Sequence, residues 1–188
     1  MIEAAHALLD ECDAVIHYNG SRFDIPTLNR EFVLHGLNPP SPYKQIDLLK
    51  TARAAFKFPS NKLDYVLEEL GLEQKVQHKG MDLWKECMAG DEKAWRTMKR
   101  YNVADVRIME PLYDRLLPWI ADHPNAALYL DAERPTCTKC GGSDLQSRGT
   151  YKTKTGSYRK FQCQGCGSWV RSRKSEVRNT DAVLSDAR

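Results

Sequence analysis

The sequence predicts an α/β domain followed by a small β-rich module built around a metal, and three observations carry this prediction. A short apolar run at 14–18 lies between two stretches with helical periodicity. Residues 91–120 form the longest helical pattern of the chain. Two Cys-x-x-Cys pairs follow in a turn-rich segment that also holds Thr and aromatic residues. A chain of 188 residues is long enough for one ordinary domain and such a module.

The first elements follow from periodicity and from residues that stop helices. Apolar spacing predicts a helix over 2–11 and a second helix over 23–34, in whose first turn Pro26 is tolerated. The run 14–18, stopped by an Asn-Gly pair, is typical of a buried strand. Residues 45–49 are interpreted as a strand that runs into a helix.

Later elements carry weaker signals. The apolar spacing of 63–70 predicts a helix, with Ser60 as its N-cap and Gly71 as its C-terminal stop. In the long helical stretch that follows, Pro111 or Pro118 is expected to cause a bend or a break. Three tryptophans at helical positions are expected in the core: Trp84, Trp95 and Trp119.

Net charge and residue composition both change near residue 133. Residues 1–132 carry 16 Lys or Arg against 20 Asp or Glu, whereas residues 133–188 carry 12 against five, a net charge of +7. The basic end is the expected contact with a polyanion. We therefore predict a front domain over 1–125, a metal module over 133–173 and a disordered tail over 174–188.

The cysteine spacing is the strongest chemical signal in the sequence. Two Cys-x-x-Cys pairs separated by 22 residues supply the four thiols of a tetrahedral zinc site, and adjacent glycines supply tight turns. The separation is slightly longer than the usual ~15 to 20 residues. Redox-active thiols are the alternative, but a redox site needs one such pair rather than two. The sequence predicts one Zn²⁺ in a four-cysteine zinc ribbon, held by Cys137, Cys140, Cys163 and Cys166.

The remaining cysteines and the hydropathy indicate the compartment. Cys12 and Cys87 are expected as small buried apolar residues rather than ligands. The chain shows no signal-peptide apolar core and no apolar run of membrane-spanning length. A cytoplasmic protein that contacts no membrane is the expectation.

Cations and aromatic residues alternate between and after the cysteine pairs. Cations neutralise phosphates and exposed rings stack on bases, so the segment is a candidate nucleic-acid site. The alternative is that the rings form the small core of the module and the cations keep it soluble. Core positions are favoured for Phe161 and Trp169. The substrate-binding candidates are Arg148, Lys152, Tyr158 and Arg159.

Acidic residues mark two places in the front domain. Asp24 follows the predicted strand at its carboxyl end, where α/β sheets form their ligand sites. Tyr101 and Asp105 are spaced i, i+4 and therefore share one helix face. Each pattern has an ordinary explanation as well, namely a helix cap for Asp24 and a surface pair for the other two. The adjacent Lys99-Arg100 pair either meets a phosphate or lies on a solvated helix face.

Taken together, these stretches resemble a known family. Residues 18–28 resemble the second motif of the DnaQ-like (DEDD) 3′-5′ exonucleases, which belong to the ribonuclease H-like superfamily, and residues 101–105 resemble their third motif, Tyr-x-x-x-Asp. The resemblance extends from residue 1 to about residue 120. Some virus-borne members of the family, such as those of phages, carry a C-terminal zinc ribbon. The resemblance implies a ribonuclease H-like α/β fold in front of the ribbon.

The resemblance also implies a mechanism. Two Mg²⁺ or Mn²⁺ ions ~4 Å apart polarise a scissile phosphate and generate hydroxide from bound water. Asp24 and Asp105 would be metal ligands, and Tyr101 would position the attacking water. Asn19 and Phe23 would hold the terminal nucleotide of the substrate.

The sequence departs from the family at its start, because no Asp-x-Glu first motif precedes the second one. Met1 corresponds to an internal position of the family, so we expect an N-terminally truncated sheet of two strands with packed helices, and weak or no activity. Asp47 is not part of the family's carboxylate set and is expected to be structural.

Three hypotheses remain open at this point. The leading one is a metal-dependent 3′-5′ exonuclease with a zinc ribbon that binds nucleic acid. Single-stranded DNA is the favoured partner. The second is a non-catalytic zinc-ribbon protein that binds nucleic acid, or a scaffold for a DNA polymerase or another replication protein. The third is a fragment of a reading frame with a misassigned start.

Overall fold

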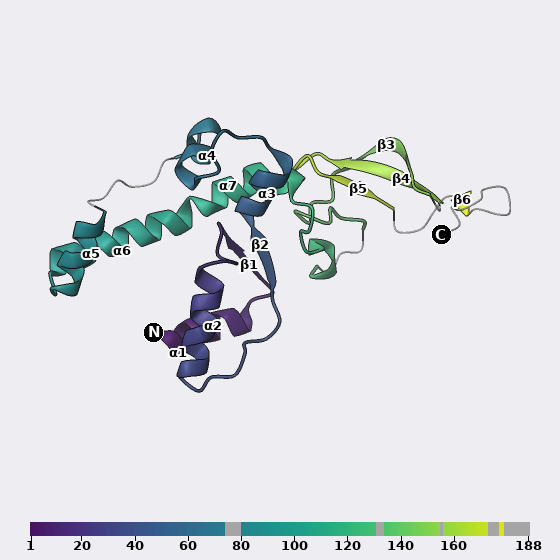
Figure 1. The fold of residues 1–188 in the computed structure, drawn as a ribbon. Helices are drawn as coiled ribbons and strands as arrows, with labels where there is room; N and C mark the ends of the chain where they lie inside the picture. Colours follow the sequence, from purple (N-terminus) through teal and green to yellow (C-terminus); the bar gives the residue numbers. More distant parts are fainter. Residues whose placement is uncertain (74–79, 131–133, 155, 173–176, 179–188) are drawn as a thin grey trace. The chain divides into compact units, whose positions relative to one another are not determined.

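The computed structural model of the chain describes residues 1–73, 80–130, 134–154, 156–172 and 177–178. The chain forms two compact units, which we call the N-terminal unit (Met1–Leu116) and the C-terminal unit (Leu117–Arg188). Figure 1 shows the elements of both units along the chain. Each unit is described by itself below.

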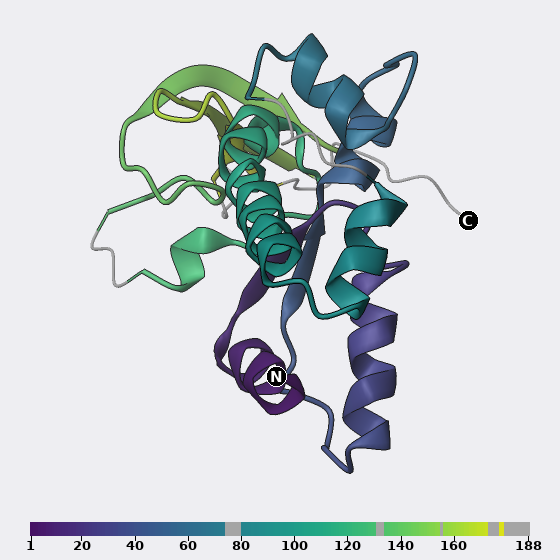
Figure 2. The same cartoon turned by 90° about the vertical axis from the view of Figure 1, so that its left-hand side faces the viewer.

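Two short parallel strands form the sheet of the N-terminal unit. Strand β1 (Ala14–His17) pairs with β2 (Lys44–Asp47) in a register that places His17 opposite Asp47. The two strands lie side by side in both views (Figures 1 and 2). Because parallel strands need a crossover, helix α2 (Asp24–Leu34) connects them. The expected two-stranded sheet is therefore confirmed within the described residues.

Helices account for most of the remaining N-terminal unit. Helix α1 packs against α2, α3 against α7, α5 against α6, and α7 also contacts both α6 and β1. The bounds are α1 (Ile2–Glu11), α3 (Leu48–Ala55), α4 (Leu63–Glu69), α5 (Met81–Met88), α6 (Glu92–Arg107) and α7 (Met109–Leu116).

The long helical stretch breaks where its proline requires it. Helix α6 ends at Arg107 and α7 begins at Met109, so the break lies just before Pro111. The ring of Pro111 would clash with the carbonyl of residue 107 in a continuous helix. Pro118 lies in the 3-10 turn η1 (Leu117–Trp119), which follows α7 directly.

The core of the N-terminal unit is apolar and lies around β2 and the helices that follow it. Leu48 begins α3 directly after Asp47 and is completely buried, as are Val66 and Leu67 on α4 and Leu112 on α7. A separate cluster between α5 and α6 is formed by Leu83, Cys87, Ala94 and Met98, with Tyr101 packed against it.

The C-terminal unit contains an antiparallel sheet. Strand β3 pairs with β4, and β4 pairs with β5 and with the short strand β6. The bounds are η2 (Ala126–Leu128), β3 (Leu145–Lys152), β4 (Gly156–Cys163), β5 (Trp169–Arg171) and β6 (Val177–Arg178). The predicted disordered tail falls mostly outside the described residues, although β6 lies within it.

Several local expectations were wrong. The N-cap of α4 is Lys62, and Ser60 only accepts a bond from the Lys62 amide through its hydroxyl oxygen at 3.3 Å. The tryptophans that were expected in the core are more than half exposed. A position in a helical pattern does not by itself show which face of the helix is buried. They are Trp84, Trp95 and Trp119. Among the helices that the structure describes, none has the length and apolar character needed to cross a membrane.

Candidate functional sites

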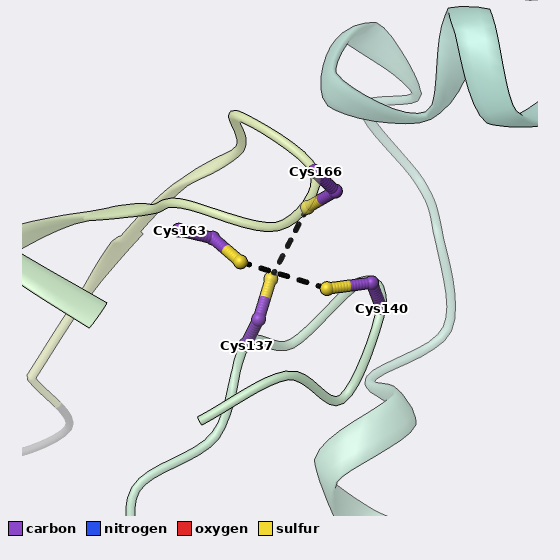
Figure 3. Close-up of side chains that lie close together, drawn as sticks. All are labelled: Cys137, Cys140, Cys163 and Cys166. Atoms are coloured by element: carbon purple, nitrogen blue, oxygen red, sulfur yellow. Dashed lines mark hydrogen bonds between the residues drawn. The ribbon is translucent and has the colours of Figure 1, made fainter. Parts of the chain in front are cut away.

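Four sulfur atoms converge in the C-terminal unit. The ligand atoms of Cys137, Cys140, Cys163 and Cys166 all lie within 4.8 Å of one another, and Figure 3 shows the side chains pointing toward a common centre. The Sγ atoms of Cys137 and Cys166 are 3.7 Å apart, and those of Cys140 and Cys163 are 3.6 Å apart. A tetrahedron with Zn–S bonds of about 2.3 Å has edges of about 3.8 Å. The four thiols therefore fit a zinc ion.

The first Cys-x-x-Cys turn directs backbone amides at its two sulfurs. The backbone amides of Lys139 and Gly142 donate to the sulfurs of Cys137 and Cys140 respectively, each at 3.4 Å. Gly141 has a φ of 73°, and a Cβ there would lie 2.6 Å from Leu130. Amides directed at sulfur favour the charged thiolate, the form that binds metal.

In the second pair, Cys166 favours the thiolate. Burial disfavours the ionised form of Cys166, but hydrogen bonds with Ser168 and the neighbouring thiols lower its pKa to about 7. The Sγ of Cys166 lies 3.1 Å from the Ser168 hydroxyl, and Ser168 is buried. Burial raises the pKa of Cys137, and it is the main cause that raises the pKa of Cys140 to about 12. Burial therefore opposes the ionisation of thiols that must be ionised to bind a metal. A cation at the centre of the cluster would overcome this opposition, because a metal deprotonates a coordinating thiol.

In the N-terminal unit, Asp47 organises the loop that follows β1. Its Oδ1 accepts from the amides of Asn19 at 2.9 Å and Leu49 at 3.0 Å, and its Oδ2 accepts from the Ser21 hydroxyl at 2.7 Å. Burial would raise the pKa of Asp47, but these bonds and nearby His17 together hold it below the ordinary value. The structure thus agrees with the structural role expected for Asp47.

The backbone of the same loop is also constrained at Asn19 and Gly20. The Gly20 amide donates to His17 Nδ1 at 3.1 Å, and a Cβ on Gly20 would lie 2.7 Å from the His17 ring. Asn19 has a φ of 67°. Its amide is satisfied by Asp47, so the carboxylate stabilises this left-handed conformation. The loop is therefore held in one conformation by side chains of both strands.

The predicted site residues of this loop are placed as follows. Phe23 is 65% exposed and precedes α2, and Asp24 is the exposed first residue of that helix. Asn19 lines a hollow of about 490 Å³ together with Tyr18 and the cations Arg53 and Lys62. An aromatic ring, a carboxylate and an amide are thus presented at the carboxyl end of β1.

Helix α6 has two chemically distinct faces. Its inner face carries Ala94, Met98 and Tyr101. Asp105 lies on the same face and is half-buried. The outer face borders a groove of about 940 Å³. Among the described residues that line it, Glu73 is acidic and five are cations. The cations are Lys93, Arg96, Lys99, Arg100 and Arg107.

The strands of the four-cysteine module separate the predicted substrate-binding residues. Tyr158 faces one side of the sheet, opposite Tyr151, while Arg159 pairs with Thr150 and therefore faces the other side, as does Lys152. Arg148 lies in the irregular segment between Ser147 and Thr150 and is exposed.

Trp169 was misplaced by the sequence interpretation. It is 53% exposed and lies opposite Gln162, on the Tyr158 side of the sheet. Phe161 is half-buried and faces the other side with Val170. The signal that could have separated the two residues is the strand period of two, since Phe161 and Tyr158 differ by an odd number of positions.

Comparison with known proteins settles the family of the front domain. The family model described as RNase_H superfamily matches residues 1–117, which is more than half of the chain. The chain belongs to the RNase H superfamily. Members of this superfamily are usually nucleases, so the match indicates nuclease-type chemistry on nucleic acid. No curated protein sequence matches the chain.

Nucleases of the RNase H superfamily usually use Mg²⁺ or Mn²⁺, which prefer several carboxylate oxygens. Across the described residues, the cysteine cluster is the one group of three or more metal-ligating side chains that converges. Asp24 and Asp105 therefore do not make a complete two-metal site within that part of the chain. Their convergence, and the roles of Tyr101, Asn19 and Phe23, stay predictions.

Proposed function

We propose that this RNase H superfamily member is a metal-dependent 3′-5′ exonuclease of the DnaQ-like type, with a zinc ribbon that binds nucleic acid. Asp24 and Asp105 serve as carboxylate ligands for Mg²⁺ or Mn²⁺, and Tyr101 orients the attacking water. Asn19 and Phe23 receive the terminal nucleotide. Four residues of the module contact the strand: Arg148, Lys152, Tyr158 and Arg159.

One observation supports this proposal above the others: the superfamily match covers the same residues that carry both motifs. The local structure is compatible with it. Hydrogen bonds tie the loop before Asp24 to Asp47, which suits a loop that positions a nucleotide. The hollow beside Asn19 is bordered by two cations, which suits a phosphate.

Two carboxylates bind hard cations weakly, so we expect slow hydrolysis by the chain. The metals, when bound, would supply Lewis-acid activation of the phosphate and of water. The protein's own contribution is positional: helix α2 presents Asp24 at its N-terminus, and helix α6 presents Tyr101 and Asp105 one turn apart.

A second candidate function is a non-catalytic nucleic-acid-binding protein or a scaffold for a polymerase. The observation in its favour is the contrast between the two metal sites. The cysteine cluster is complete, whereas no acidic cluster of three is found among the residues that the structure describes.

Digestion of 3′-labelled single-stranded DNA in Mg²⁺ or Mn²⁺ tests the proposal. We expect slow, metal-dependent removal of nucleotides that is abolished by Asp24→Ala and by Asp105→Ala. Asp114→Ala, which removes an exposed carboxylate from α7, is the matched control and should keep the activity. Hydrolysis that survives both substitutions would overturn the assigned site. Binding without any hydrolysis would favour the second candidate function.

A further inference from the structure

One face of the sheet in the C-terminal unit gathers aromatic rings and cations. Tyr151 on β3 lies opposite Tyr158 on β4, and Lys160 on β4 lies opposite Arg171 on β5. Tyr158 and Lys160 are two positions apart on one strand, so all four side chains share a face. Trp169 joins them, because it is two positions before Arg171. We call these five residues the aromatic face.

The rings and cations of the aromatic face contact one another. The guanidinium carbon of Arg171 lies 4.2 Å from the centre of the Tyr158 ring and 5.6 Å from that of Tyr151. The Lys160 ammonium lies 5.0 Å from the centre of the Trp169 ring. Such cation–π contacts orient the side chains before any ligand arrives, which lowers the ordering cost of binding.

Much of this aromatic surface is open to solvent. Tyr151 is 48% exposed and Trp169 is 53% exposed. Tyr158, between them, is half-buried. The opposite face instead carries the more buried apolar pair, Phe161 and Val170. The rings of Tyr151 and Trp169 therefore do not form the core of the module. Exposed aromatic clusters of this kind usually mark a binding surface.

The charge of the sheet indicates the class of ligand that it attracts. Residues 145–172 contain six Lys or Arg and no Asp or Glu. An acidic polymer is therefore attracted, while basic partners are repelled. Flat rings beside cations match a polymer that repeats a planar base and a phosphate.

We propose that the aromatic face is a stacking platform for unpaired bases of single-stranded nucleic acid, with Lys160 and Arg171 neutralising the adjacent phosphates. This assignment rests on the proposed function of the module as a nucleic-acid binder and identifies the face and the form of substrate that it takes. Bases in a duplex are stacked on each other and present no free face, so the platform discriminates against double strands. Lys152 and Arg159, on the other side of the sheet, contribute charge without this preference.

Fluorescence anisotropy with labelled dT20, U20 and a 20-base-pair DNA duplex tests the proposal on the full zinc-loaded chain, without added Mg²⁺ or Mn²⁺. Tyr151→Thr and Trp169→Thr remove the rings but keep a residue that favours strands. Each should weaken the binding of dT20 and of U20 about tenfold. Duplex binding should change less than about twofold.

The chain offers a matched control for Trp169. Trp119 belongs to the same unit, is 54% exposed and lies outside the sheet, in η1. Trp119→Thr should leave the affinity for dT20 unchanged. Zinc content is measured for every variant, and Trp169→Phe, which retains a ring, should keep most of the affinity and one zinc per chain.

Three results would overturn the platform. They are an equal loss of single-strand and duplex binding, an equal effect of Trp119→Thr, or full affinity in Tyr151→Thr and Trp169→Thr. Because no hydrolysis is measured, this outcome is independent of Asp24 and Asp105. The comparison of dT20 with U20 shows whether the sugar is read as well, since stacking alone treats DNA and RNA alike.

Discussion

The two units contrast in how their candidate metal ligands are brought together. In the C-terminal unit, the four thiols come from two short turns, and the antiparallel sheet places both turns at one end. In the N-terminal unit, Asp24 and Asp105 lie on two helices that are far apart along the chain. The first site is set by local hairpin geometry, and the second depends on the packing of a whole domain.

This difference explains why one site is complete and the other remains a prediction. Ligands fixed by turns need only a few backbone hydrogen bonds, such as Gly141 to the Cys137 carbonyl at 2.9 Å. Ligands on separate helices need a sheet to orient both helices, and the described sheet of the N-terminal unit has two strands. Sheets of that size depend on their helices for stability.

The largest expected effect concerns the thiols. Cys163→Ser removes one of the four thiols. Structural zinc sites bind the metal with apparent free energies of about 10 to 16 kcal/mol, and this binding is coupled to folding. We expect about one zinc per chain before the substitution and none after it. Metal analysis by mass spectrometry and amide exchange of β3 and β4 measure the result.

Cys12→Ser is the matched control, because Cys12 lies in the N-terminal unit and outside the cluster. It should keep the zinc and the exchange pattern. A folded Cys163→Ser protein that still holds one zinc would contradict the four-thiol site. Loss of zinc from both variants would show that the loss in Cys163→Ser is not specific to the cluster.

An intermediate effect is expected from the carboxylate that holds the loop after β1. Asp47→Ala leaves three donors without their acceptor, and we expect a loss of about 2 to 3 kcal/mol in the stability of the N-terminal unit. Asp47→Asn keeps an oxygen for the Asn19 and Leu49 amides and should cost less. Amide exchange of residues 18–24 reports both, and Asp114→Ala should leave this exchange unchanged.

The same carboxylate gives a pH dependence with a defined sign. The pKa of Asp47 is lower in the folded protein than its ordinary value of 3.8. Its contribution to stability is therefore fully present above that ordinary value and is lost as the pH falls through the lower, folded pKa. Asp47→Asn should show a smaller loss of stability below about pH 4. An identical acid profile in both proteins would show that Asp47 does not carry the effect.

Local signals predicted most of the N-terminal unit. The helix over 2–11, the strand after it and the Pro26-containing helix all followed from periodicity and from stop residues. The break between α6 and α7 was expected at a proline, and it occurs at Ile108 because Pro111 acts on the carbonyl four positions earlier. The cap of α4 was wrong, since an N-cap depends on the local backbone path as well as on residue type.

The sites were less evenly predictable. Cysteine spacing identified all four members of the thiol cluster, because the spacing itself encodes the turn. The aromatic face was missed, since its members come from three strands whose register the sequence does not show. Residues two positions apart on a strand share a face, as Tyr158 and Lys160 do, and Trp169 and Arg171. This pattern can be recognised only once the strands are assigned.

The smallest expected effect concerns the outer face of α6, and it shows whether the N-terminal unit also holds nucleic acid. Arg100 and Arg107 line its groove and are exposed. If they meet phosphates, Arg100→Ala and Arg107→Ala should each reduce the slope of log affinity for dT20 against log salt by about 0.7. Lys57→Ala, an exposed cation outside the groove, is the control and should leave the slope unchanged. Equal slopes in all three variants and the unaltered chain would mean that Arg100 and Arg107 contact solvent rather than phosphates of the strand.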